Sequence, residues 1–159
     1  MNNSTQFLTK PILLFSFMMG LGTSTGCLTG ELAQPNQVPI SDAGFDQVVY
    51  LGSESSATVF LEGRASCDPN GHAITSASWS LLEAPGASTL EINTVSTLQG
   101  FFEATTPGIY LLSLKVTAND QESNPDFVEI IVREGAGDDD TGTLPTTDAC
   151  GNTISGATT

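Results

Sequence analysis

Few side chains in this sequence belong to the types that carry catalytic chemistry. His72 is the only histidine, and it lies in a polar loop beside Asp68 and Asn70. The sequence contains no G-x-S-x-G, no H-E-x-x-H and no glycine-rich phosphate loop, the motifs that would place a nucleophile, a zinc ion or a nucleotide. We therefore expect the protein not to be an enzyme, since turnover would have to depend on His72 or on an unrecognised pair of carboxylates.

The loop around His72 has the composition of a tight turn between two strands. In Asp68-Pro69-Asn70-Gly71, proline fixes φ, asparagine and glycine tolerate positive φ, and aspartate accepts hydrogen bonds from nearby backbone N–H groups. Apolar residues alternate with polar ones over residues 58–62 before the turn and over 76–81 after it. The stretch 63–79 therefore predicts a strand, a turn and a second strand that carries the only tryptophan, Trp79, in the core.

The same alternation continues along the chain. It is clearest where Tyr110, Leu112, Leu114 and Val116 share one parity, and no segment has a sustained helical period. Further short strands are expected near residues 48–51, 90–92, 102–104 and 128–133. About seven short strands between proline- and glycine-containing turns predict an all-β fold, an antiparallel β-sandwich over residues 39–134.

The N-terminus has the layout of a secretory signal peptide over residues 1–26. A polar start with Lys10 precedes an apolar run at 12–19 and a series of small residues before Cys27. The apolar run is about half of the roughly 20 residues that a spanning helix needs. The end of the segment resembles a bacterial lipoprotein signal, which implies a lipid anchor on Cys27, a tether over 27–38 and, with Leu28 next, the outer membrane. Ordinary cleavage, giving a periplasmic or secreted protein with a free Cys27, is the alternative.

Four segments together carry a resemblance to a known domain family. Their order and spacing are similar to those of polycystic kidney disease (PKD) domains, which occur in bacterial surface proteins and secreted enzymes. The segments are DAGFDQV at 42–48, LEGRASCDPNG at 61–71, SWSL at 78–81 and PGIYLLSLKVT at 107–117. The resemblance implies an immunoglobulin-like sandwich and an exported protein, but it implies no particular ligand, because function depends on sites that differ within a fold.

Some members of this family bind calcium near the N-terminal segment and the loop after the second strand. The resemblance therefore implies a possible calcium site built from the oxygen atoms of Asp42, Asp68, Asn70 and Asp120, because Ca²⁺ takes six to eight oxygen ligands. No cofactor is otherwise required. The alternative is that Asp68 and Asn70 only fold the turn, with their side chains bonded to the backbone.

The cysteines allow several arrangements. If Cys27 is lipidated, Cys67 and Cys150 remain, and two thiols in an oxidising compartment can form a disulfide. A free thiol and a bridge to another molecule are the alternatives. A zinc site from Cys67, His72 and Cys150 is a further one, although the sequence has no C-x-x-C spacing.

The chain is strongly acidic after Cys27. Removal of residues 1–26 leaves three basic residues against 18 acidic ones, a formal charge of −15. Such a surface repels nucleic acid, so we expect no nucleic-acid partner. From Glu134 onward the chain has few apolar residues and three consecutive aspartates, which predicts an acidic, disordered tail over residues 135–159.

Two apolar residues fall on the outer face of the last strands by parity. Leu111 and Ile131 would lie close together if these strands pair, and an exposed apolar patch marks a binding surface. The alternative is that the tether, the tail or neighbouring side chains cover it. We interpret the protein as a non-catalytic cell-surface binding or adhesion module that recognises an extracellular protein or glycan. The alternative is a structural spacer without a ligand of its own.

Overall fold

The computed structural model describes residues 35–86 and 90–155. Its strands are β1 (Gln47–Tyr50), β2 (Ala57–Glu62), β3 (Ile74–Glu83), β4 (Asn93–Thr94), β5 (Gln99–Ala104), β6 (Gly108–Ala118), β7 (Gln121–Glu122) and β8 (Asp126–Arg133). Within the described ranges there is no helix of the length and apolarity that crossing a bilayer requires. Residues 1–26, Cys27 and most of the expected tether lie outside these ranges.

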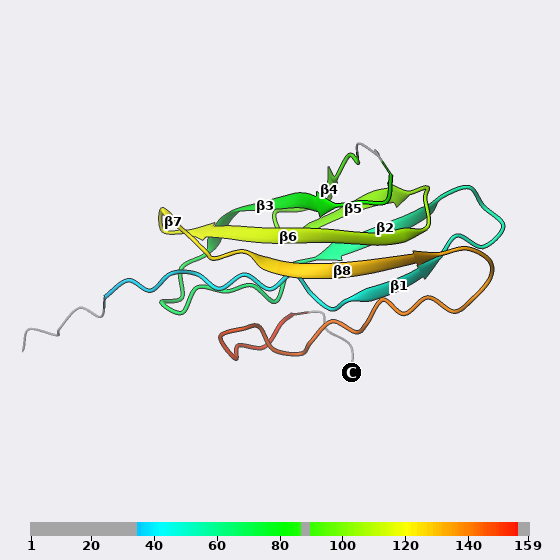
Figure 1. Cartoon of the computed structure of the whole chain (residues 1–159). Coiled ribbons are helices and arrows are strands. Elements are labelled where there is room, and N and C mark those ends of the chain that lie inside the picture. The colour runs from blue at the N-terminus through cyan, green and yellow to red at the C-terminus, as the bar shows by residue number, and fades with distance from the viewer. Residues whose placement is uncertain (1–34, 87–89, 156–159) are drawn as a thin grey trace, which may run out of the picture. The chain divides into compact units, whose positions relative to one another are not determined.

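The strands form two sheets, which face each other in Figure 1. One has the order β1-β8-β6-β3 with β7 beside β6, and the other has the order β2-β5-β4. The pairs are antiparallel except that β1 pairs with β8 in parallel. The structure therefore confirms the immunoglobulin-like β-sandwich. The short strand expected near 90–92 lies slightly later, at β4, and β7 is a two-residue strand that the sequence did not indicate.

The core follows the alternation of the sequence. Tyr110, Leu112, Leu114 and Val116 of β6 are fully buried, because inward residues of a central strand face the opposite sheet. Trp79 packs against this core from β3 but is only half-buried. The reason is that β3 is the edge strand of its sheet and pairs only with β6. The indole Nε1 of Trp79 is buried without a hydrogen-bond partner.

Residues 135–155, here called the strap, run back along the sandwich after β8 (Figure 1). Val48 and Asp140 exchange two backbone hydrogen bonds of 2.7 and 2.8 Å. Beside them, the backbone N–H of Tyr50 donates to Asp139 Oδ1 at 2.7 Å. The strap then reaches Ala65, whose carbonyl accepts from the N–H of Ala149 at 2.8 Å.

The prediction of a disordered tail was therefore wrong for residues 135–155. Composition correctly indicated that this segment cannot form a core of its own. Composition alone does not show that the free edge of β1 offers backbone hydrogen-bond partners to this segment. The Cys67–Cys150 disulfide, one of the alternatives that the sequence left open, also holds the segment in place. Residues 156–159 lie outside the described ranges.

Candidate functional site

The carboxylate of Asp68 closes the loop that the sequence singles out. The Asp68 side chain is fully buried, and its Oδ1 accepts from the N–H of Asn70 at 2.6 Å. The Asp68 carbonyl accepts from the N–H of Gly71 at 2.9 Å, and Gly71 has a φ of 79°, a conformation that favours glycine. Asp68 Oδ2 is buried without a hydrogen-bond partner. One oxygen of this carboxylate thus maintains the turn.

The structure does not gather the four residues expected to bind calcium. Asp42 Oδ1 accepts from the N–H of Gly44 at 3.0 Å, Asn70 Oδ1 accepts from the N–H of Gln37 at 2.6 Å, and Asp120 lies exposed in the β6–β7 turn with a φ of 60°. Among the described residues, Asp42, Asp68 and Asp120 form no cluster of converging ligand atoms. These residues as placed do not fit the six to eight oxygens that Ca²⁺ takes.

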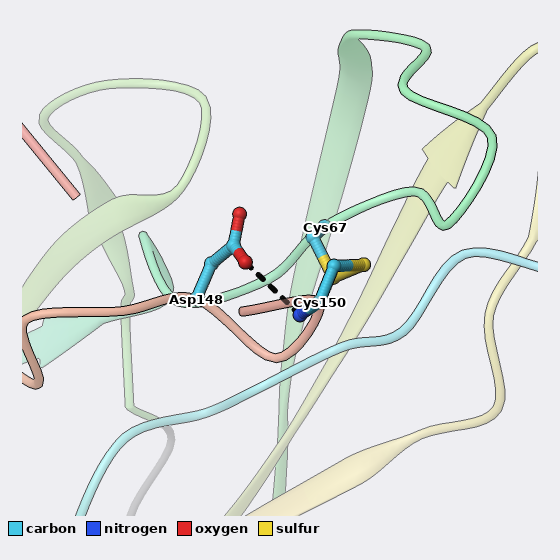
Figure 2. Close-up of side chains that lie close together, drawn as sticks. All are labelled: Cys67, Asp148 and Cys150. Carbon is cyan, nitrogen blue, oxygen red and sulfur yellow. Dashed lines mark hydrogen bonds between the residues drawn. A yellow bond between two sulfur atoms is a disulfide. The ribbon is translucent and has the colours of Figure 1, made fainter. Parts of the chain in front are cut away.

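A disulfide joins Cys67, in the loop after β2, to Cys150 of the strap (Figure 2), and the two residues are 83 positions apart in the sequence. Their sulfur atoms and a carboxylate oxygen of Asp148 lie within 4.8 Å of one another. Bonded sulfurs are not thiolates, so this arrangement excludes the zinc site with His72 while the bond persists. Of the arrangements that the sequence left open for these cysteines, the structure has the Cys67–Cys150 disulfide.

Asp148 organises the end of the strap beside this disulfide. Its Oδ1 accepts from the backbone N–H groups of Cys150 at 3.0 Å and of Asn152 at 2.8 Å. Partial burial by itself would raise the pKa of Asp148, but the hydrogen bonds from Asn152, Cys150 and Gly151 outweigh it. The pKa of Asp148 therefore lies below its ordinary value, and a negative charge stands beside the sulfurs at neutral pH.

His72 has the surroundings of a loop residue. Its side chain is 43% exposed, and Nδ1 lies 3.2 Å from Asp68 Oδ1. Within the described residues no serine hydroxyl lies at hydrogen-bond distance from His72. The arrangement that a serine nucleophile requires, a hydroxyl bonded to the imidazole, is not formed around this histidine.

The outer face of the five-stranded sheet carries the two apolar residues expected there, Leu111 and Ile131, but they are not directly opposite each other. Ile131 pairs with Ile109, while Leu111 pairs with Glu129, so that Leu111 and Ile131 are diagonal neighbours. Ile109 is 51% exposed, and Leu111 and Ile131 are half-buried. We call these three residues the outer patch.

A hollow that the sequence did not indicate lies between the strap and the start of β8. It has a volume of about 450 Å³, and its lining includes the rings of Phe45 and Phe127 and the carboxylates of Asp46 and Asp126. Residues 145 and 147–149 of the strap complete it. Sequence reasoning missed it because the strap was expected to be disordered, and no local pattern signals that these distant segments meet.

Comparison with known proteins identifies the domain. The model of the family described as "K319L-like, PKD domain" matches residues 43–132, which is more than half of the chain and excludes the strap. No curated protein matches the chain.

Similar solved structures include two PKD domains. That of the KIAA 1837 protein is 24% identical with a TM-score of 0.49, over 62% of this chain and 89% of the other. That of human KIAA0319 is 17% identical with a TM-score of 0.48, over 77% and 100%. A nucleoside hydrolase-related hypothetical protein from Saccharophagus degradans is 19% identical with a TM-score of 0.46, over 62% and only 26%. The family match, over strands that form the predicted sandwich, means that this chain belongs to the K319L-like PKD domain family.

Proposed function

We propose that the protein is a non-catalytic cell-surface module that binds an extracellular protein or glycan through the outer patch. The observation that carries the proposal is the exposure of Ile109 and its neighbours on the outer face of the five-stranded sheet, where Ile109 remains 51% exposed. Apolar side chains gathered on a rigid sheet face are a feature of interaction surfaces.

The position of the outer patch supports a binding role. Ile109, Leu111 and Ile131 lie on two central, antiparallel strands, whose backbone is fixed by pairing on both sides. Polar neighbours border the patch, with Glu129 opposite Leu111 and Lys115 further along β6. An apolar centre with a polar margin is the usual composition of a protein–protein contact.

We further propose that the mature chain begins at Cys27 and is held on a membrane by lipid on this residue, as an outer-membrane lipoprotein. The Cys67–Cys150 disulfide supports export, because disulfides persist in oxidising compartments. Between Cys27 and the sandwich, a short tether would leave the outer patch accessible to partners outside the cell.

The test uses the mature chain with Cys27→Ser, so that the protein stays soluble. Immobilised protein is exposed to a glycan array and to extracellular protein extracts. Retention is measured for this chain and for its Leu111→Asp variant. We expect Leu111→Asp to abolish retention, since a charge at the centre of an apolar contact must be desolvated without a partner. Phe60→Asp is the matched control, because Phe60 is 66% exposed on the other sheet.

Two results would contradict the proposal. Retention that Phe60→Asp and Leu111→Asp reduce equally would place binding elsewhere. Reproducible absence of any retained partner would favour the spacer, a domain that holds other parts of a surface protein apart without a ligand.

A further inference from the structure

The hollow between the strap and β8 combines two aromatic rings with four carboxylates. Phe45 and Phe127 line it with exposed fractions of 54% and 52%. Asp42, Asp46, Asp126 and Asp148 line it as well. Large aromatic side chains that stay half-exposed beside a hollow are available to a ligand, and here the surrounding charge is uniformly negative.

The walls of this hollow are fixed by hydrogen bonds between segments distant in sequence. Asp46 Oδ1 accepts from the N–H of Glu129 at 2.8 Å, and Asp126 Oδ2 accepts from the N–H of Ala43 at 2.7 Å. Each bond uses one carboxylate oxygen and joins the segment before β1 to β8. The aromatic rings are therefore carried by backbone that is already ordered, which lowers the entropic cost of binding.

The strap contributes to the position of Phe45. Gly142 has a φ of 67°, and a Cβ at this position would lie 2.9 Å from the Cβ of Phe45. Only glycine allows the strap to pass this close to the phenylalanine. The hollow thus depends on the strap, which lies outside the residues that the family model matches.

Arg64, Lys115 and Arg133 are the basic residues of the part of the chain that the structure describes, and none of them lines the hollow. Arg64 pairs with Glu62 at 2.7 Å, and Lys115 pairs with Glu122 at 2.7 Å. Arg133 donates to the hydroxyl of Tyr50 at 3.3 Å. The negative charge in the hollow is not neutralised from within, and a second copy, equally acidic and with its cations engaged, is a poor occupant.

We propose that this hollow binds an arginine or lysine side chain of a basic polypeptide. An aromatic face attracts a cation through its quadrupole, and carboxylates beside it add charge and hydrogen-bond acceptors. Aromatic rings supply no oxygen ligand for a divalent metal ion. They can instead stack on the flat guanidinium group and pack against the apolar stem of arginine. The net negative charge of the protein draws such a partner toward the surface.

The test measures fluorescence anisotropy of a labelled peptide of alternating glycine and arginine with the mature Cys27→Ser chain at physiological salt. The control peptide carries citrulline in place of arginine, which keeps the shape and removes the charge. We expect only the arginine peptide to bind. Phe45→Ala and Phe127→Ala should each weaken it by about two- to five-fold, and Phe60→Ala, on the other sheet, should not.

Charge variants separate a site from general attraction. Asp46→Asn keeps a hydrogen-bond acceptor for Glu129 and removes one charge, and Asp138→Asn removes one charge from the exposed strap. We expect the first to weaken binding more than the second. Equal weakening by both, with no effect of the phenylalanine variants, would overturn the proposal in favour of diffuse attraction. Equal binding of the citrulline peptide would also overturn it.

Two further measurements test whether the peptide binds in the hollow and not at the outer patch. Amide chemical shifts of the unsubstituted chain should change at Phe45, Phe127 and Ala149 when the arginine peptide is added, and changes located elsewhere would refute the site even if a variant misfolds. Leu111→Asp should keep peptide binding, so that failure of the outer patch and failure of the hollow are distinguishable. Retention of neutral glycans that requires both phenylalanines but tolerates Asp46→Asn would assign the hollow to sugars instead.

Discussion

Asp68 illustrates how a buried carboxylate can be needed for local structure. One of its oxygens accepts the N–H of Asn70 and faces His72, while the other has no partner within the described residues. The loop therefore depends on the acceptor, and the unpartnered oxygen is the position where a cation would have to bind. The two roles can be separated by experiment.

Calcium is tested through the melting temperature. The oxygens of Asp42, Asp68 and Asp120 do not converge, so we expect the same melting temperature in millimolar Ca²⁺ and in EDTA. Asp68→Ala should lower it in both by removing the turn acceptor, a loss of about 1–2 kcal/mol of unfolding free energy, whereas Asp68→Asn keeps an acceptor and should lose less. A rise in Ca²⁺ that Asp68→Ala abolishes would instead establish a cation site.

Glu62 gives the fold a dependence on pH. Burial alone would raise the pKa of Glu62, but hydrogen bonds from the side chain and backbone of Arg64, its charge, and a bond from Gln99 outweigh this and lower it. Because the folded state holds the proton less tightly than the unfolded chain, this contribution is present above the ordinary glutamate pKa. It is lost as the pH falls through the lowered value.

We therefore expect this contribution to the unfolding free energy to stay constant from neutral pH down to the ordinary glutamate pKa of about 4.3 and to fall on further acidification. Glu62→Gln should lose less on this further acidification than the unsubstituted chain, and Arg64→Ala should flatten the profile in the same direction. Urea unfolding at a series of pH values measures both. Identical slopes for all three proteins would show that the Glu62–Arg64 pair does not contribute.

The strap is the element whose structure depends most on one bond. It pairs with β1 only through an isolated bridge between Val48 and Asp140, and none of its residues belongs to the hydrophobic core. The Cys67–Cys150 bond joins it to the sandwich, and its stabilising effect arises because a cross-link restricts the unfolded chain. For 83 residues of separation, this restriction contributes at most about 4.5 kcal/mol.

Cys150→Ser should therefore lower the unfolding free energy by up to about 4.5 kcal/mol, which is measured as a lower urea midpoint. Reduction of the unsubstituted chain should lower the midpoint to the same level. The β-sheet circular dichroism should persist under native conditions, because the core residues belong to β1–β8. A midpoint that neither the substitution nor reduction changes would mean that the bond is absent in solution.

The sequence predicted those elements whose side chains follow a local pattern, such as the apolar–polar alternation of a strand or the composition of a turn. The alternation at 110–116 gave the inward residues of β6, and the turn composition at 68–71 gave the loop before β3. The parallel pairing of β1 with β8 and the path of the strap along β1 could not be predicted, since both depend on backbone hydrogen bonds between distant segments, which no local side-chain pattern signals. Phe45 and Phe127 could not be recognised as part of a hollow from the sequence, because the hollow also needs residues of the strap.

At the scale of the whole molecule, the net charge limits how the protein can attach to a membrane. A mature chain with three basic and 18 acidic residues would be repelled by anionic lipid headgroups, so the membrane attachment proposed for it has to come from a lipid. If the lipid anchors the chain, this repulsion would favour positions of the acidic domain away from the headgroups.

Intact mass of the protein extracted from membranes tests this arrangement. We expect a chain that starts at Cys27 and carries acyl mass, with two thiols that become alkylated only after reduction. Cys27→Ser should move the protein to the soluble fraction. Recovery of the unsubstituted protein in the soluble fraction without acyl mass would exclude the anchor.

The contact of the strap with β1 also limits how copies of this protein can associate. The N–H groups of Val48 and Tyr50 are both taken by the strap, so that edge of the five-stranded sheet cannot accept a strand from a neighbour. The opposite edge, β3, is paired on one side only. Strand-to-strand association through this sheet would therefore end at two copies, because a continuous fibril needs two free edges on every molecule.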